Sequence, residues 1–328
     1  MRIRIVGLLV GCLGLVMALL ASIAFGKSSL PFATVVDSLL SFDGSREHLI
    51  VRSVRVPRAL IALAVGACLA VAGAVMQAVT RNALAGPELF GVNQGAALLI
   101  VLNIFVMGHS SLSGHLAYAY AGAAIAGVIV FALASFGGRG MTPVKLILAG
   151  STVNLLFAAL TQGVLIFDEE SLDTMRFWLA GSLTGRSLDL FMQVLPFMAC
   201  GLLIALLMSR SINLLSLGED VAVGLGQRTA LVKVAALVVV VLLAGSSVAI
   251  AGPIAFVGLA VPHIARFAVG RDYRWVLPYS AVFGAILLLL ADTGARFVMP
   301  SQEISAGIVT ALLGAPFLVY LAQRREQR

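Results

Sequence analysis

The chain has 328 residues, of which 60% are hydrophobic and only 11% are charged. Soluble domains carry about 25% charged residues, so this composition excludes a water-soluble globular fold and indicates a protein embedded in a lipid bilayer. The net charge of +7 does not indicate a nucleic-acid partner, because the basic residues follow the pattern of membrane loops described below.

About ten stretches of the chain are apolar and long enough to cross a bilayer as helices. The first has about 21 residues, more than the apolar core of a signal peptide, and is therefore expected to remain as a helix. The apolar runs are continuous, which argues against the alternating strands of a membrane barrel. The sequence predicts an all-α, polytopic membrane protein with a single transmembrane domain over residues 1–328. The expected spans are 5–25, 58–79, 91–108, 115–136, 143–167, 189–209, 230–250, 254–269, 276–297 and 305–322.

The lysine and arginine residues set the expected orientation. An even number of spans places both termini on one side, and with both termini in the cytoplasm most of the 22 basic residues fall in cytoplasmic loops. Acidic residues run the other way, because the segment 168–173 places four of them in one outer loop. We therefore expect both termini to be cytoplasmic.

Two loops are too long to be simple connectors. The outer segment 26–57 contains an amphipathic stretch, Pro31–Leu40, which is expected to lie along the membrane surface. The cytoplasmic segment 210–229 mixes apolar residues with three glycines, as two short helices joined by a turn would. Its apolar side predicts a docking partner, and the acids after the turn suit the start of a helix. The residues expected to carry this contact are Leu217, Gly218, Glu219, Asp220, Val221 and Leu225.

The run 251–263 differs from the other apolar segments. It contains Gly252, Pro253, Gly258 and Pro262, and each proline interrupts helical hydrogen bonding. Irregular backbone at membrane depth must be buried in protein or line a cavity. We therefore predict a broken helix or tight turn that faces the protein interior.

No catalytic residue, metal site or cofactor is expected. Residues 21–28 resemble a phosphate-binding loop, but that loop needs a preceding strand in a nucleotide-binding domain, whereas this stretch ends an outer-facing membrane helix. The HExxH and GxSxG motifs are absent, the four histidines are scattered, and the three cysteines lie in apolar runs. The chain is therefore not expected to hydrolyse ATP.

Two groups of charged residues near the outer side each allow two interpretations. Asp292 is the one acid deep in a predicted span, and Arg296 follows on the same helix face, so the two residues form either a structural pair or a functional site. Arg52, Arg55 and Arg58 form a basic group that runs against the positive-inside rule. This group is either a solvated patch or a docking site for an acidic protein surface.

Several motifs resemble one known family. They include Arg55-Val-Pro-Arg58, the run 73–77 (Gly-Ala-Val-Met-Gln), the run 81–96 and the run 214–219. The most specific matches are 251–266 (Ala-Gly-Pro-Ile-Ala-Phe-Val-Gly-Leu-Ala-Val-Pro-His-Ile-Ala-Arg) and 307–317. In this order the motifs resemble the permease subunits of ATP-binding-cassette importers for iron–siderophores, haem and vitamin B12. Ala83 is a departure, because the family usually carries proline there.

The resemblance implies ten helices in each of two adjacent permease subunits, identical or paralogous, in a bacterial cytoplasmic membrane. It also implies a separate cytoplasmic ATPase dimer, which binds the segment 210–229, and an outer substrate-binding protein. Acidic residues on the two lobes of that protein are expected to meet Arg55, Arg58 and Arg296. The substrate implied first is a ferric siderophore.

Three rival functions are carried forward. An importer of the same build for haem or vitamin B12 is the nearest. An ion-coupled secondary transporter would need several buried acids, and Asp292 alone fits that requirement. A membrane-embedded enzyme would need a catalytic constellation, which the sequence lacks.

Overall fold

The computed structural model describes residues 2–26, 30–107, 112–136, 142–167, 178–298 and 303–326, and every element in those ranges is a helix. The elements in chain order are α1 (Arg2–Ala24), α2 (Phe32–Leu40), α3 (Arg46–Ile50), η1 (Val51–Arg55), α4 (Val56–Thr80), η2 (Pro87–Phe90), α5 (Val92–Met107), α6 (Leu112–Ser135), α7 (Pro143–Ile166), α9 (Leu188–Leu207), α10 (Ser209–Leu217), α11 (Glu219–Gly224), α12 (Thr229–Val240), η3 (Val241–Gly245), α13 (Ser246–Ala251), α14 (Val257–Val269), α15 (Tyr273–Val298) and α16 (Ala306–Glu326).

The helices match the predicted spans in position. Seven helical segments of the described chain are long and apolar enough to cross a membrane, and three shorter apolar helices, α5, α14 and the first part of α16, lie at the other predicted positions. The prediction of an all-helical, multi-pass membrane fold is confirmed. The largest boundary difference is at the second span, where one continuous helical segment runs over Arg46–Thr80.

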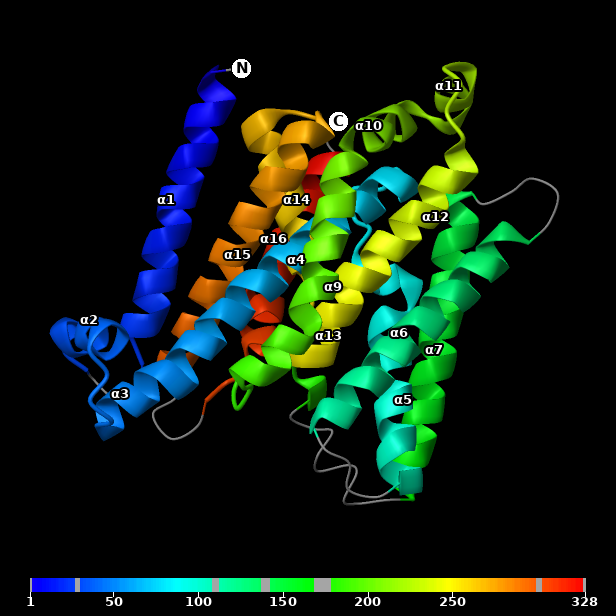
Figure 1. The fold of residues 1–328 in the computed structure, drawn as a ribbon. Coiled ribbons are helices and arrows are strands. Elements are labelled where there is room, and N and C mark those ends of the chain that lie inside the picture. Colours follow the sequence, from blue (N-terminus) through cyan, green and yellow to red (C-terminus); the bar gives the residue numbers. More distant parts are fainter. Residues whose placement is uncertain are drawn as a thin grey trace.

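Helix α4 lies at the centre of the bundle and contacts α15, α14, α12 and α9 (Figure 1). Glycines allow the close contacts, because a Cβ at Gly66 would collide with the carbonyl of Gly284 on α15, and a Cβ at Gly73 with that of Gly258 on α14. Small residues at helix crossings are the usual means of close packing in lipid. The small residues of the second span therefore serve helix packing.

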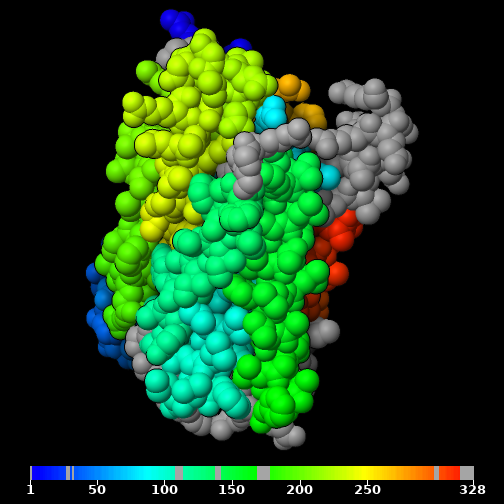
Figure 2. Space-filling model, turned by 90° about the vertical axis from the view of Figure 1, so that its right-hand side faces the viewer, coloured from blue at the N-terminus to red at the C-terminus, as the bar shows by residue number. Residues whose placement is uncertain are grey.

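Helices α6 and α7 lie side by side at the edge of the bundle, where Figure 2 shows them in green. Along α7 the side chains of Val144, Leu148 and Leu155 are 66%, 62% and 73% exposed. An apolar face of this kind requires lipid or another apolar surface as its neighbour.

Two short helices cap one end of the bundle. Helices α10 and α11 lie at the end where the chain starts, at the top of Figure 1. Following the orientation expected from the sequence, we call this the inner end, and we call the opposite end, where α2 and α3 lie, the outer end. The predicted amphipathic stretch, Pro31–Leu40, forms helix α2.

The predicted break is present, although it is shorter than expected. A π-helical turn, η3, and one short helix, α13, lead to Gly252, where the helix stops and the chain continues without helix to Phe256. Gly252 has φ +71°, and Phe256 has φ +79°, a region that side-chain-bearing residues rarely adopt. Pro262 does not break the chain, because α14 runs through it.

Candidate functional site

A cluster of buried charges lies where α4 and α15 meet at the outer end. Asp292 is fully buried and Arg58 is 6% exposed. Arg58 donates from Nε to both carboxylate oxygens of Asp292, at 3.0 and 2.9 Å, and from Nη2 to Oδ1 at 2.9 Å. Arg296 donates from Nη2 to the second oxygen of Asp292 at 2.6 Å. One carboxylate therefore holds two guanidinium groups.

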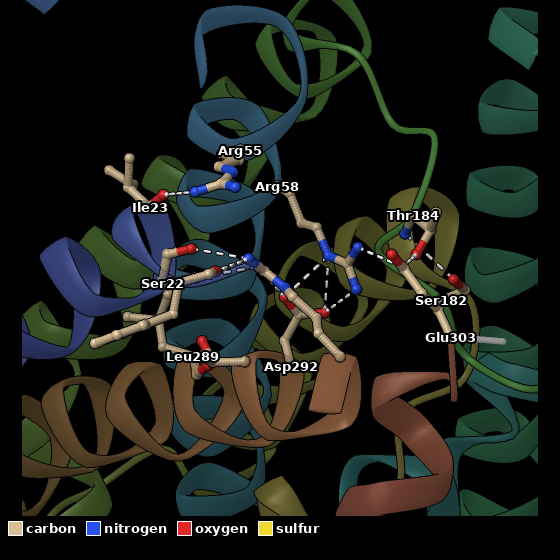
Figure 3. Close-up of polar contacts among 12 residues, drawn as sticks. Ser22, Ile23, Arg55, Arg58, Ser182, Thr184, Leu289, Asp292 and Glu303 are labelled. Atoms are coloured by element: carbon tan, nitrogen blue, oxygen red, sulfur yellow. Dashed lines mark hydrogen bonds and ion pairs between the residues drawn. The ribbon is translucent and has the colours of Figure 1, made fainter. Parts of the chain in front are cut away.

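Glu303 closes the cluster from the segment that precedes α16. Arg58 donates from Nη1 to Glu303 Oε2 at 2.7 Å, and Thr184 donates to the same oxygen at 3.2 Å. Figure 3 shows Arg58 between Asp292 and Glu303. Sequence reasoning missed Glu303; the available signal was a single acid directly before a span, close to the outer basic group.

Two arginines also anchor the end of α1. Arg296 donates from Nη1 to the carbonyls of Ser22 and Phe25, at 2.8 and 2.9 Å. Arg55 donates from Nη1 to the carbonyls of Ile23 and Ala24, at 3.0 and 2.6 Å. The last carbonyls of a helix lack partners within the helix, and cations favour this end of its dipole. The guanidinium groups therefore cap α1.

The cluster answers one question that the sequence left open. Arg296 pairs with Asp292, and both residues are buried. Arg55, Arg58 and Arg296 are only 5%, 6% and 5% exposed, so they are not a solvated patch. Removing one partner from such a pair leaves an uncompensated charge in a low dielectric, which costs about 3–5 kcal/mol. In this conformation the three arginines therefore hold α1, α4, α15 and the start of α16 together.

Arg52 points away from this cluster. It donates from Nε to the carbonyl of Ser38 at 2.7 Å and from Nη2 to that of Leu39 at 3.0 Å. Arg52 thus caps the end of α2, as Arg55 and Arg296 cap the end of α1. All four arginines singled out in the sequence therefore make hydrogen bonds within the chain: Arg52, Arg55, Arg58 and Arg296.

The inner end carries the predicted pair of short helices. Gly218 has φ +129° and ψ 149° between α10 and α11, a conformation that is essentially restricted to glycine. Glu219 and Asp220 lie in the first turn of α11. The predicted contact residues Leu217, Val221 and Leu225 are 66%, 48% and 63% exposed.

One ion pair connects this inner segment to α12. Lys233 donates to Glu219 Oε1 at 2.6 Å, and Thr229 donates to the same oxygen at 3.2 Å. The Glu219 side chain is 41% exposed. We call residues 209–226 the inner segment. Its side chains Leu217, Val221 and Leu225 face outward, whereas Ile212 and Leu215 pack inward, and the contact of Glu219 with Lys233 fixes the segment to α12.

Behind the broken helix, Gln77 compensates for the proline in α14. Pro262 cannot donate to Gly258, which lies four residues before it. Gln77 of α4 is 4% exposed and donates from Nε2 to the carbonyls of Gly258 and Leu259, at 3.5 and 3.0 Å. This contact explains how α14 remains a helix across Pro262 and corrects the prediction that both prolines interrupt it.

A cavity of about 650 Å³ opens next to Gln77 at the inner end. Its lining is mainly polar and basic, and Asp272 lies in its wall. Hydrogen bonds from Arg274 and Asn213 hold the pKa of Asp272 well below its usual range, so this acid stays charged near neutral pH. The lining residues are Gln77, Ala78, Arg81, Ala83, Asn213, Ser216, Leu217, His263, Arg266, Arg271, Asp272 and Tyr273.

The break itself borders a second hollow. Pro253 and Ala255 line a groove of about 490 Å³ together with residues of α16. On its other side a Cβ at Gly252 would collide with the carbonyl of Trp178, and Gly307 donates its backbone N–H to the carbonyl of Gly181 at 3.0 Å. Gly252 and Ile254 are buried, so the break lies between the loop that follows Trp178 and α16.

Within the described ranges, no group of three or more histidine, cysteine, aspartate or glutamate side chains is placed to hold a metal ion. The polar groups instead gather at the two ends of an apolar helical bundle, next to a broken helix. This arrangement defines a multi-pass helical membrane protein. Residues 14–324 match the FecCD transport family, and the chain belongs to that family.

Named relatives share almost the whole length of the chain. The chain is 49% identical over 310 residues to the Bacillus subtilis protein named "Probable siderophore transport system permease protein YfiZ", covering 94% of this chain and 93% of that one. It is 44% identical to the Fe(3+)-citrate import system permease protein YfmD of the same organism, over 92% and 90% of the two chains. The family resemblance predicted from the motifs is confirmed.

A solved structure supports the same assignment. The structure described as "An inward-facing conformation of a putative metal-chelate type ABC transporter" superposes on this chain with a TM-score of 0.83 and 32% sequence identity. The superposition covers 96% of this chain and 98% of the other. The bundle around α4, with the break between α13 and α14, is therefore an ABC transporter fold.

Proposed function

We propose that this chain is the membrane-spanning permease subunit of an ABC importer that carries a ferric chelate. The observation that carries the proposal is family membership along nearly the whole chain together with the exposed inner segment. The relatives named above are permeases for siderophores and ferric citrate. The proposed substrate class is therefore a ferric chelate.

The inner segment is the proposed contact with a separate ATPase subunit. Leu217, Val221 and Leu225 present an apolar face that water does not favour, and Gly218 permits the sharp turn behind it. Helix-in-groove docking of such a face is a common recognition mode. ATP hydrolysis falls to the partner, since relatives of this chain are permease subunits.

The proposed topology is ten spans with both termini in the cytoplasm of a bacterium, in its cytoplasmic membrane. Seven long apolar helices and three shorter ones support the count, and the positive-inside rule supports the orientation.

Two such subunits, identical or paralogous, would lie side by side and form the substrate path between them. The groove of about 490 Å³ at Pro253 has α16 as its other wall. We expect this groove to change shape during transport, because the backbone beside it is not helical.

The outer end is the proposed docking site for a substrate-binding protein. Arg55, Arg58 and Arg296 concentrate positive charge there, and guanidinium groups bind carboxylates in a bidentate manner. These side chains already make bonds within the chain, so an incoming carboxylate either exchanges one of these bonds, such as that of Arg58 to the 30% exposed Glu303, or uses N–H groups that the bonds leave open.

A haem importer is the second candidate, since the hemin transport permease of Yersinia pestis is 37% identical to this chain. Its lower identity than that of the ferric-chelate permeases favours the first candidate. The test is uptake into proteoliposomes that contain the permease with its ATPase subunit. Radioactive ferric chelate should accumulate only with ATP and an outer binding protein. Uptake driven by an ion gradient without ATP would show instead a secondary transporter.

A further inference from the structure

A small pocket lies beside the buried charge cluster at the outer end. Its volume is about 170 Å³, and it opens between the start of α4 and the loop that leads to α9. Two guanidinium-bearing residues, Arg58 and Arg186, line it. The full lining is Ser53, Val54, Arg58, Leu183, Gly185, Arg186 and Ser187.

Arg186 differs from the other arginines of this end. Within the described part of the chain it makes no hydrogen bond or ion pair, and its Nε is buried without a partner. Burial lowers the pKa of Arg186, but an arginine stays charged at any physiological pH. A partly buried cation without a counter-ion is costly unless something supplies the missing charge.

The charges of the neighbouring cluster are already balanced. Arg58 and Arg296 face Asp292 and Glu303, which makes two cations and two anions. The bonds of Arg58 leave one N–H on Nη1 and one on Nη2 without a partner among the described residues. Ser187 accepts a hydrogen bond from the N–H of Leu190, so its hydroxyl is still able to donate. The pocket therefore offers donors and a net positive charge.

We propose that this pocket binds the carboxylate of one aspartate or glutamate on the docked substrate-binding protein, held by Arg186 and by the remaining N–H groups of Arg58. The proposal rests on the proposed function and adds Arg186 to the docking surface. The volume of about 170 Å³ gives room for one carboxylate side chain, and the two guanidinium groups of the lining favour an anionic group.

The experiment uses the complete importer in lipid nanodiscs, with the native binding protein that co-purifies with it as the probe. Arg186→Glu replaces attraction with repulsion and should weaken binding at least about tenfold at low salt. Arg186→Lys keeps the positive charge but cannot bind a carboxylate through two parallel N–H groups. Its affinity for the binding protein should lie between those of the parent and of Arg186→Glu. Arg46→Glu is the matched control, since Arg46 is an exposed arginine of the same end outside the pocket lining. It should change affinity no more than about fivefold.

A charge-reversal screen makes the test specific. Each acid on the docking face of the binding protein is changed to lysine, and one of these variants should restore binding to Arg186→Glu but not to Arg46→Glu. Should Arg186→Glu fail to insert, Arg186→Gln replaces it and should weaken binding in the same sense.

Three results would overturn the assignment. The first is an affinity for the binding protein that is the same in the inserted Arg186 variants as in the parent. The second is an equal loss of affinity in Arg46→Glu and Arg186→Glu. Binding of ferric citrate by the permease alone, lost in Arg186→Glu, would show a substrate site instead. If the parent binds no binding protein at all, the proposed function fails rather than the pocket alone.

Discussion

The outer and inner ends of the molecule use their charged and apolar residues in opposite ways. At the outer end Arg55, Arg58 and Arg296 are no more than 6% exposed and bind groups of their own chain. At the inner end Leu217 and Leu225 are 66% and 63% exposed. The cluster of Arg55, Arg58 and Arg296 at the outer end is thus satisfied within the chain, whereas the inner end presents an apolar surface that needs a partner.

The difference teaches that residue type alone does not identify a contact surface. Arginines outside a membrane attract attention because they oppose the positive-inside rule, yet here their first partners are helix carbonyls and buried carboxylates. The exposed apolar side chains of the inner segment follow a simpler rule, because an exposed apolar face on a pair of short helices indicates an external partner. The two ends should therefore respond differently to substitution.

The largest effect is expected from Asp292→Ala. This change leaves Arg58 and Arg296 without their shared carboxylate, and should lower the free energy of unfolding by about 3–5 kcal/mol. Thermal unfolding of the purified permease in detergent measures it. Glu303→Gln is the control, because the Glu303 side chain is 30% exposed and should cost clearly less. Equal unfolding temperatures for Asp292→Ala and the parent would show that the cluster does not hold the outer end together.

The next largest effect is expected at the inner end, from Gly218→Leu. Any side chain is strained at φ +129°, by about 1–3 kcal/mol, so the turn and the face behind it should move. ATP hydrolysis by the assembled importer should continue while uptake is lost. Gly224→Ala is the control, because Gly224 has an ordinary backbone conformation and open space around it. Normal uptake by an inserted Gly218→Leu variant would rule out the coupling role.

Much of the fold was predictable because lipid imposes one requirement on every span. A helix must be apolar over about 20 residues to cross the bilayer, so the predicted and observed segments agree from α1 to α16. The short helices α10 and α11 were also predictable, since Gly218 marks the turn. The break at Gly252 was predictable from its glycine and proline, whereas its end at Phe256 was not.

The site was predictable only in part, because its contacts join residues far apart in the sequence. Asp292 and Arg296 are four residues apart on one helix, so their pairing was foreseeable. The bond between Arg58 and Asp292 joins positions 234 residues apart, and no local pattern indicates it. Likewise, the support that Gln77 gives to α14 depends on how two helices cross.

A moderate effect is expected from Gln77→Leu, which tests that support. The carbonyls of Gly258 and Leu259 would lose their donor in a buried position, which costs about 1–3 kcal/mol. Unfolding temperature and proteolysis of the segment around α14 measure the change. Gln162→Leu makes the same chemical change on an exposed face of α7 and should be close to neutral. If both variants behave alike, Gln77 does not support the helix across Pro262.

The smallest effect is expected from Glu219→Gln, and it tests how firmly the inner segment is held. The Lys233–Glu219 pair is short, at 2.6 Å, but the glutamate side chain is 41% exposed, so water and salt screen the attraction. Exposed pairs are worth about 0–1 kcal/mol. A double-mutant cycle with Lys233→Met isolates the pair, and its coupling energy should stay within that range and decrease with added salt. A salt-independent coupling above about 2 kcal/mol would mean that the pair behaves as a buried one. The inner segment would then be clamped to α12 as firmly as the outer end is clamped by Asp292, and the contrast between the two ends would not hold.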